Sequence, residues 1–94
     1  MVYLLIRHKV EDYDTWKSMY DEHAAARKAA GSQGARLLRN TNDGNEVVAI
    51  ISWPDFQHAQ AFSNSPDLHA VMQKAGVIGV PDLLYLEEVE ETPA

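Results

Sequence analysis

The stretch from Asn45 to Pro54 constrains the fold more than any other, because it is apolar on both of its sides. A turn signal, Asn42-Asp43-Gly44, precedes this stretch, and Pro54-Asp55 closes it. Its β-branched and aromatic residues predict a strand, in which alternate side chains point to opposite faces. The two alternate sets are Glu46, Val48, Ile50 and Ser52, and Val47, Ala49, Ile51 and Trp53. Neither set is cleanly polar, so we expect a central strand with a covering layer on each face.

Length and charge exclude several classes of protein. We expect a single domain over residues 1–94, with an acidic strand end and tail at 87–94. Eight Lys and Arg against fourteen Asp and Glu give a net charge of −6 with no basic stripe, so we expect no nucleic-acid and no membrane partner. The chain has no cysteine, which excludes disulfides and thiolate nucleophiles. The first seven residues lack a signal-peptide pattern, and a cytoplasmic location is expected.

Start and stop signals divide the chain into alternating strands and helices. Acidic residues at 11–14 open a helix that is expected to run to about Ala30, before Gly31. Asp55 is expected to cap a second helical region, which is interrupted at 63–64 and restarts with Ser65 as N-cap and Pro66 as its first residue. We interpret the segment 77–81 as a short apolar linker. The expected strands are 2–10, 34–40, 45–54 and 82–89.

The resulting order, β-α-β-β-α-β, is typical of the ferredoxin-like α+β fold, a four-stranded antiparallel sheet with both helical regions on one face. An antiparallel sheet with a wet face normally alternates apolar and polar residues. The segments 2–6, 47–51 and 83–86 do not. The face away from the helices would then be an apolar patch larger than a soluble monomer usually exposes. We therefore expect a homodimer in which two sheet faces pack together.

One motif gives the sequence a family resemblance. Trp53-Pro54-Asp55-Phe56 leads into Ala59-Gln60-Ala61-Phe62-Ser63-Asn64-Ser65-Pro66 and on to Met72. In this pattern the chain resembles the antibiotic-biosynthesis-monooxygenase-like proteins of the dimeric α+β barrel superfamily, over residues 2–89. The resemblance implies a homodimer with a pocket between each sheet and its helices. Members include cofactor-free oxygenases of aromatic polyketides and enzymes that degrade haem. The haem-degrading members carry an Asn on the first strand, which is absent here, and we expect no cofactor.

Four histidines are the side chains that titrate near neutral pH and can act as general bases. His23 borders the buried stripe of the first helix, and His8 shares a strand face with Leu4 and Ile6, so each is a candidate for a pocket or for a structural position. His58 and His69 flank apolar helix faces, and of these two His69 is retained as a candidate. None of the four forms a metal-binding spacing, so we predict no metal site. The candidate catalytic residues are His23, His8 and His69.

Candidate substrate-binding residues are of two kinds. Five aromatic residues are candidates for the wall of a pocket for a flat ligand, although packing in the core explains each of them as well. They are Trp16, Tyr20, Trp53, Phe62 and Tyr85. Arg36 and Asn40 share one face of the segment 34–40 with Leu38, where they can bind a carbonyl or enolate oxygen or remain solvated.

These patterns leave two functional hypotheses. In the first, the chain is a small homodimer that binds a hydrophobic or aromatic metabolite between sheet and helices and oxygenates or cyclises it without a cofactor. In the second, it is a non-catalytic dimer that binds a small molecule or has a structural role. An enzyme requires a pocket of at least ~300 Å³ on which two or more polar groups converge.

Overall fold

The computed structural model describes residues 1–94, and its centre is a pair of antiparallel strands, β1 (Val2–Val10) and β3 (Asp43–Trp53). The edge strands β2 (Ala35–Asn40) and β4 (Val77–Glu87) complete one sheet in the order β2-β3-β1-β4. Between the strands lie α1 (Tyr13–Glu22) and α2 (Ala24–Ala29), and then α3 (Phe56–Ser63) and α4 (Pro66–Lys74). The order β-α-α-β-β-α-α-β confirms the ferredoxin-like prediction, with each helical region divided in two.

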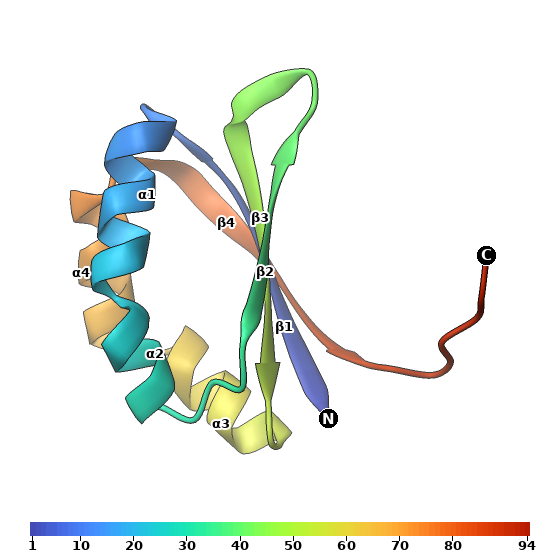
Figure 1. Ribbon diagram of the computed structural model, residues 1–94. Helices are drawn as coiled ribbons and strands as arrows, with labels where there is room; N and C mark the ends of the chain where they lie inside the picture. Colours follow the sequence, from blue (N-terminus) through green and yellow to red (C-terminus); the bar gives the residue numbers. More distant parts are fainter.

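All four helices cover the same face of the sheet (Figure 1). One set of alternate residues on β3 faces them and is buried, and Trp53 at its end is 0% exposed. The principal core combines these residues with the inward side chains of β1 and with residues of α3 and α4. Its buried members are Leu4, Ile6, Ala49, Ile51, Trp53, Ala59, Phe62 and Leu68.

The other face of the sheet carries no helix (Figure 1), and we call it the open face. The pairing Tyr3↔Leu86, Leu5↔Ile50 and Leu5↔Leu84 places these apolar side chains together on it. Leu84 is 53% exposed, and Leu38 on β2 is 49% exposed. After β4 the chain turns away from the body on the side opposite the helices (Figure 1).

The helix caps confirm the signals in the sequence. The side chains of Asp12, Asp55 and Ser65 accept hydrogen bonds from Thr15, His58 and Leu68 backbone N–H groups at the starts of α1, α3 and α4. The expectation of one continuous helix to Ala30 is wrong, because the chain leaves helical geometry at His23, with φ −83° and ψ 1°. None of the helices has the length and apolar character that a membrane crossing requires.

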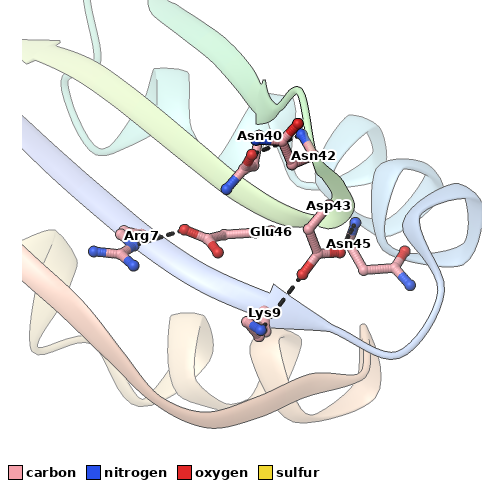
Figure 2. A network of polar contacts seen from close by, with 7 residues as sticks. All are labelled: Arg7, Lys9, Asn40, Asn42, Asp43, Asn45 and Glu46. Atoms are coloured by element: carbon pink, nitrogen blue, oxygen red, sulfur yellow. Dashed lines mark hydrogen bonds and ion pairs between the residues drawn. The ribbon is translucent and has the colours of Figure 1, made fainter.

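The turn between β2 and β3 is tighter than expected. Thr41 and Asn42 form it, and Asp43 already pairs with Asn40 in the sheet. A side-chain oxygen accepts a hydrogen bond from the backbone in this turn, since Asn42 N–H donates to Asn40 Oδ1 over 2.8 Å. Ion pairs join β1 to the turn end of the hairpin: Arg7 Nε lies 2.9 Å from Glu46 Oε1, and Lys9 Nζ lies 3.4 Å from Asp43 Oδ2 (Figure 2).

The interpretation of residues 77–81 as a linker is also wrong, because these residues open β4. Val77 and Ile78 pair with Val10 and Lys9, and the regular pairing resumes at Asp82 opposite Arg7. Two steps on β1 therefore face four steps on β4, which is a bulge containing Gly79, Val80 and Pro81. Gly79 has a φ of +71°, a conformation that glycine adopts readily. Pro81 is tolerated because β4 is an edge strand.

Candidate active site

A cleft of about 410 Å³ lies between α4 and the bulged part of β4. From α4 it receives His69, Met72 and Gln73, and from β4 it receives Val77, Gly79, Val80, Pro81 and Leu83. The wall is mostly apolar, and His69 and Gln73 are its hydrogen-bonding side chains. This volume and the two polar groups meet the requirement for a small-molecule pocket.

His8 lies on β1 opposite the bulge, between the pairs Arg7↔Asp82 and Lys9↔Ile78. It points toward the helices with Leu4 and Ile6, as its strand position predicts, and it is 6% exposed. A second hollow of about 190 Å³ is lined by His8 and also by Gly79 and Val80. Gly79 and Val80 of the bulge line both the cleft and this hollow, whereas His8 lines the hollow alone. Arg7, Lys9 and Glu46 also line the hollow, so it opens on the face of the sheet away from the helices.

The imidazole of His8 has no hydrogen-bond partner at either ring nitrogen. Buried polar atoms are rarely left unpaired in folded proteins, because an atom that loses its hydrogen bonds to water and gains none in the protein lowers the stability of the fold. Burial lowers the pKa of His8 below its ordinary value of 6.5, since the charged form is the one that water stabilises most. At neutral pH the ring is uncharged, so one nitrogen offers a lone pair and the other an N–H.

Aromatic rings continue from His8 along α1. The ring of Trp16 lies 5.3 Å from that of His8 and 5.1 Å from that of Tyr20, with the second pair stacked. Trp16 is buried and belongs to the smaller core cluster with Val10, Val47 and Ala75. These two predicted substrate-binding residues thus lie together beside His8, where they also pack the helix on the sheet.

Trp53 and Phe62 form a separate aromatic contact, with ring centroids 4.9 Å apart. The indole N–H of Trp53 is buried and has no partner. His23 lies 6.2 Å from Phe62, and its Nε2 is 2.9 Å from Asp67 Oδ2. The contact between His23 and Asp67 joins the α1–α2 junction to the start of α4. It lies beside a hollow of about 250 Å³ that is distinct from the cleft.

His69 is fixed at the cleft by the end of α3. Its Nε2 lies 3.1 Å from the backbone oxygen of Ser63. A carbonyl oxygen only accepts hydrogen bonds, so Nε2 carries the proton and Nδ1 keeps its lone pair in the neutral ring. The hydroxyl of Ser63 is hydrogen-bonded to that of Tyr85, whose ring meets Phe56 edge-on at 5.0 Å.

Two predicted substrate-binding residues lie elsewhere. Arg36 pairs with Ile50 on the open face and lines a hollow of about 570 Å³ there. Asn40 is exposed at the end of β2. The structure therefore does not bring either residue to the histidines. His58 is exposed on α3, where its Nδ1 lies 2.7 Å from Asp55 Oδ1, and no group of three acidic or histidine side chains is placed to hold a metal ion.

The family model for antibiotic biosynthesis monooxygenases matches residues 1–74. The chain belongs to the antibiotic biosynthesis monooxygenase family. No protein of curated function matches the sequence. SnoaB, a cofactor-independent oxygenase from Streptomyces nogalater, is similar in structure with a TM-score of 0.79 and 18% identity, covering 99% of this chain and 97% of SnoaB.

Other solved structures of the family have the same arrangement. A Bordetella bronchiseptica protein assigned to these monooxygenases gives a TM-score of 0.79 at 13% identity, covering 95% of this chain and 97% of its own. The corresponding protein of Caulobacter crescentus gives 0.75 at 17% identity, covering 95% and 90%. At sequence identities below 20%, structural similarity shows that the fold is shared. The chemistry of this chain depends on its own residues.

Sequence reasoning missed the β4 side of this cleft. Gly79 and Pro81 were the available signal, because both residues are typical of bulges and edge strands as well as of linkers. Gln73 carried no signal, since a glutamine near a helix end is usually solvated. Asp67 was missed as the partner of His23 because the two are 44 residues apart and meet through tertiary packing alone.

Proposed function

We propose that this chain is a homodimeric, cofactor-independent monooxygenase that binds a hydrophobic aromatic metabolite in the cleft between α4 and β4. His8 is the general base. The observation that carries the proposal is the burial of an uncharged His8 without a hydrogen-bond partner, opposite the bulge that forms one wall of the cleft. An unpaired buried imidazole costs stability, and a substrate that hydrogen-bonds to it explains why it is kept.

The family and its neighbours support the reaction type. The chain matches antibiotic biosynthesis monooxygenases, and SnoaB is a cofactor-independent oxygenase of the same fold. Without a cofactor, the substrate itself must reduce dioxygen. An aromatic compound with an acidic methylene group, such as a hydroxyanthrone, can supply all the electrons that are needed.

The chemistry of this class balances without an added reductant. His8 takes a proton from the methylene carbon, and the resulting carbanion passes its electrons to dioxygen. A C–O bond forms, the O–O bond breaks, and one oxygen atom leaves as water with the two former methylene hydrogens. The carbon becomes a carbonyl, and His8 is neutral again.

The protein's contribution is to desolvate and orient the substrate. The apolar wall excludes water, so that the carbanion is not simply reprotonated by solvent. Gln73 can donate a hydrogen bond to a substrate oxygen, and Nδ1 of His69 can accept one from a substrate hydroxyl. Because the nitrogens of His8 are buried, the bulge has to move for the substrate to reach them, and within the bulge Val80 is 94% exposed.

The dimer follows from the open face. Leu84 and Leu86 on β4 and Leu38 on β2 are exposed in a single copy, and the apolar open-face residues of β1 and β3 are half-buried. A second copy packed sheet to sheet would cover them. Arg36 would then lie near the interface, and a role for it in binding substrate would depend on the partner.

The proposal is tested by following oxidation of a hydroxyanthrone by absorbance and by oxygen consumption. We expect turnover above the rate without protein, and its loss in His8→Phe with the fold retained. His69→Phe should raise KM more than it lowers kcat, and His58→Phe, at an exposed position, should be unchanged. No turnover of any hydroxyanthrone, combined with no thermal stabilisation by aromatic ligands, would favour the non-catalytic dimer instead.

A further inference from the structure

A further hollow, of about 410 Å³, lies at the opposite edge of the sheet from the cleft. It is enclosed by the ends of α1 and α2 and by the loop that leads into β2. Its lining includes Tyr20, Ala24, Arg27, Lys28, Ser32 and Gln33, with no acidic residue. This hollow shares no lining residue with the proposed oxygenation site.

Arg27 is a buried cation without a carboxylate partner. It is 9% exposed, and it takes part in none of the ion pairs of the chain. Its Nη1 donates to the backbone oxygen of Tyr20 over 2.8 Å, and its guanidinium lies 3.8 Å above the Tyr20 ring. Its other guanidinium nitrogens are not among the buried atoms that lack a partner, so they are open to solvent and accessible to a ligand.

Helix ends explain part of this arrangement. Basic residues in the last turn of a helix are favoured by its dipole, and Arg27 and Lys28 occupy the last turn of α2. That effect accounts for Lys28, which is exposed. It does not account for Arg27, whose side chain leaves α2 to reach an α1 carbonyl. The hydrogen bond to Tyr20 uses one of the five guanidinium N–H groups. The other four are free to donate to a ligand in the hollow, which Arg27 lines.

We infer that this hollow binds the anionic group, a carboxylate or a phosphate, of a small ligand. Arg27 provides the planar fork that matches such oxygens, Lys28 provides a second positive charge, and Ser32 and Gln33 provide neutral donors. The Tyr20 ring and Ala24 offer an apolar surface to the adjoining part of the ligand. A ligand of this charge binds here in spite of the net charge of −6, because the local charges are positive.

The test is an NMR titration of the full chain at low ionic strength with inorganic phosphate and, separately, with benzoate. We expect saturable shifts of the Gln33 and Gly34 amides with at least one anion. The anion that saturates them assigns the group as phosphate or carboxylate. Lys28→Gln should weaken binding about fivefold, as expected for loss of one exposed charge. Lys74→Gln removes the same charge from α4 and should leave binding unchanged.

Arg27→Lys keeps the positive charge at this position but removes the planar guanidinium group. It should fold, since the aliphatic stem and the positive charge remain, and it should bind the anion more weakly than the wild type. Because Arg27 also holds the Tyr20 carbonyl, Lys28→Gln is the variant on which the inference depends. Absence of saturable shifts with both anions would overturn it, as would equal weakening in Lys28→Gln and Lys74→Gln.

Discussion

Both ring nitrogens of His8 are buried without partners, so we predict that His8→Phe keeps or raises stability at pH 7. Phenylalanine retains the aromatic contact with Trp16 and removes two polar atoms whose hydration is lost on folding. Urea unfolding of the variant and the wild type measures the difference. Gln57→Phe, at an exposed position of α3, is the control and should change stability by less than about 0.5 kcal/mol. A loss above about 2 kcal/mol in His8→Phe would show that the imidazole makes a structural polar contact.

The lowered pKa of His8 also predicts how stability depends on pH. The unfolded chain takes up a proton on His8 near its ordinary pKa of 6.5, whereas the folded chain does so only at a lower pH. Stability should therefore fall as the pH drops below about 6.5, and level off below the folded-state pKa. The pKa values of Asp12 and Asp55 are lowered from 3.8 by hydrogen bonds to Thr15 and His58, so their contribution is lost only in more acidic solution.

Urea unfolding between about pH 7.5 and 5 isolates the histidine contribution. The wild type should lose stability over this range by more than His8→Phe does. Identical slopes for the two proteins would mean that His8 is not desolvated in the folded state.

The orientation of individual site residues could be predicted where they lie on a strand, because alternate side chains point to opposite faces of the sheet. The alternation along 2–10 placed His8 with Leu4 and Ile6, and the structure agrees. The same alternation grouped Arg36 with Leu38, but it gives no indication of which face of the sheet the helices cover. Contacts such as that between His23 and Asp67 depend on how two helices pack, which no local pattern encodes.

At the scale of elements, capping residues located the helix starts, because a side-chain oxygen that accepts a backbone N–H has a local sequence signature. The break at His23 has no such signature, since no glycine or proline interrupts 13–29. The length of β4 was underestimated, because Gly79 and Pro81 are as typical of a linker as of an edge strand with a bulge. The error matters for function, since those residues form the bulge and one wall of the cleft.

Gly79→Ala tests the importance of that bulge. An added Cβ would meet no atom within 4 Å, so the cost comes from the φ of +71°, which is about 1–2 kcal/mol for a residue other than glycine. We expect this loss of stability together with altered binding of the hydroxyanthrone. Gly34→Ala is the matched control: its φ is +130° and its Cβ site is also open, but it lies far from the cleft. Equal effects of the two variants on turnover would argue against a role for the bulge.

At the scale of the whole molecule, the open face is the surface that the helices leave uncovered (Figure 1). Paired strands place the apolar residues of β1, β3 and β4 on it as one surface. Charged residues gather at its hairpin end, where Arg7 and Lys9 meet Glu46 and Asp43 (Figure 2). An apolar centre with a charged border is typical of a surface that associates with another protein, and a second copy provides the same surface.

Ile50→Asp tests this assembly. Ile50 lies on the open face, whereas its neighbour Ile51 is 2% exposed in the core. At this half-buried position the aspartate would keep part of its hydration in a single copy. In a dimer it would be fully buried, where an unpaired carboxylate costs several kcal/mol. We therefore expect a folded monomer of 10.5 kDa by light scattering, against twice that mass for the wild type. Gln57→Asp adds the same charge on the exposed surface of α3 and should remain dimeric, and Ile51→Asp should unfold. A wild type that is monomeric at micromolar concentration, or a dimeric Ile50→Asp, would show that the open face is not the interface.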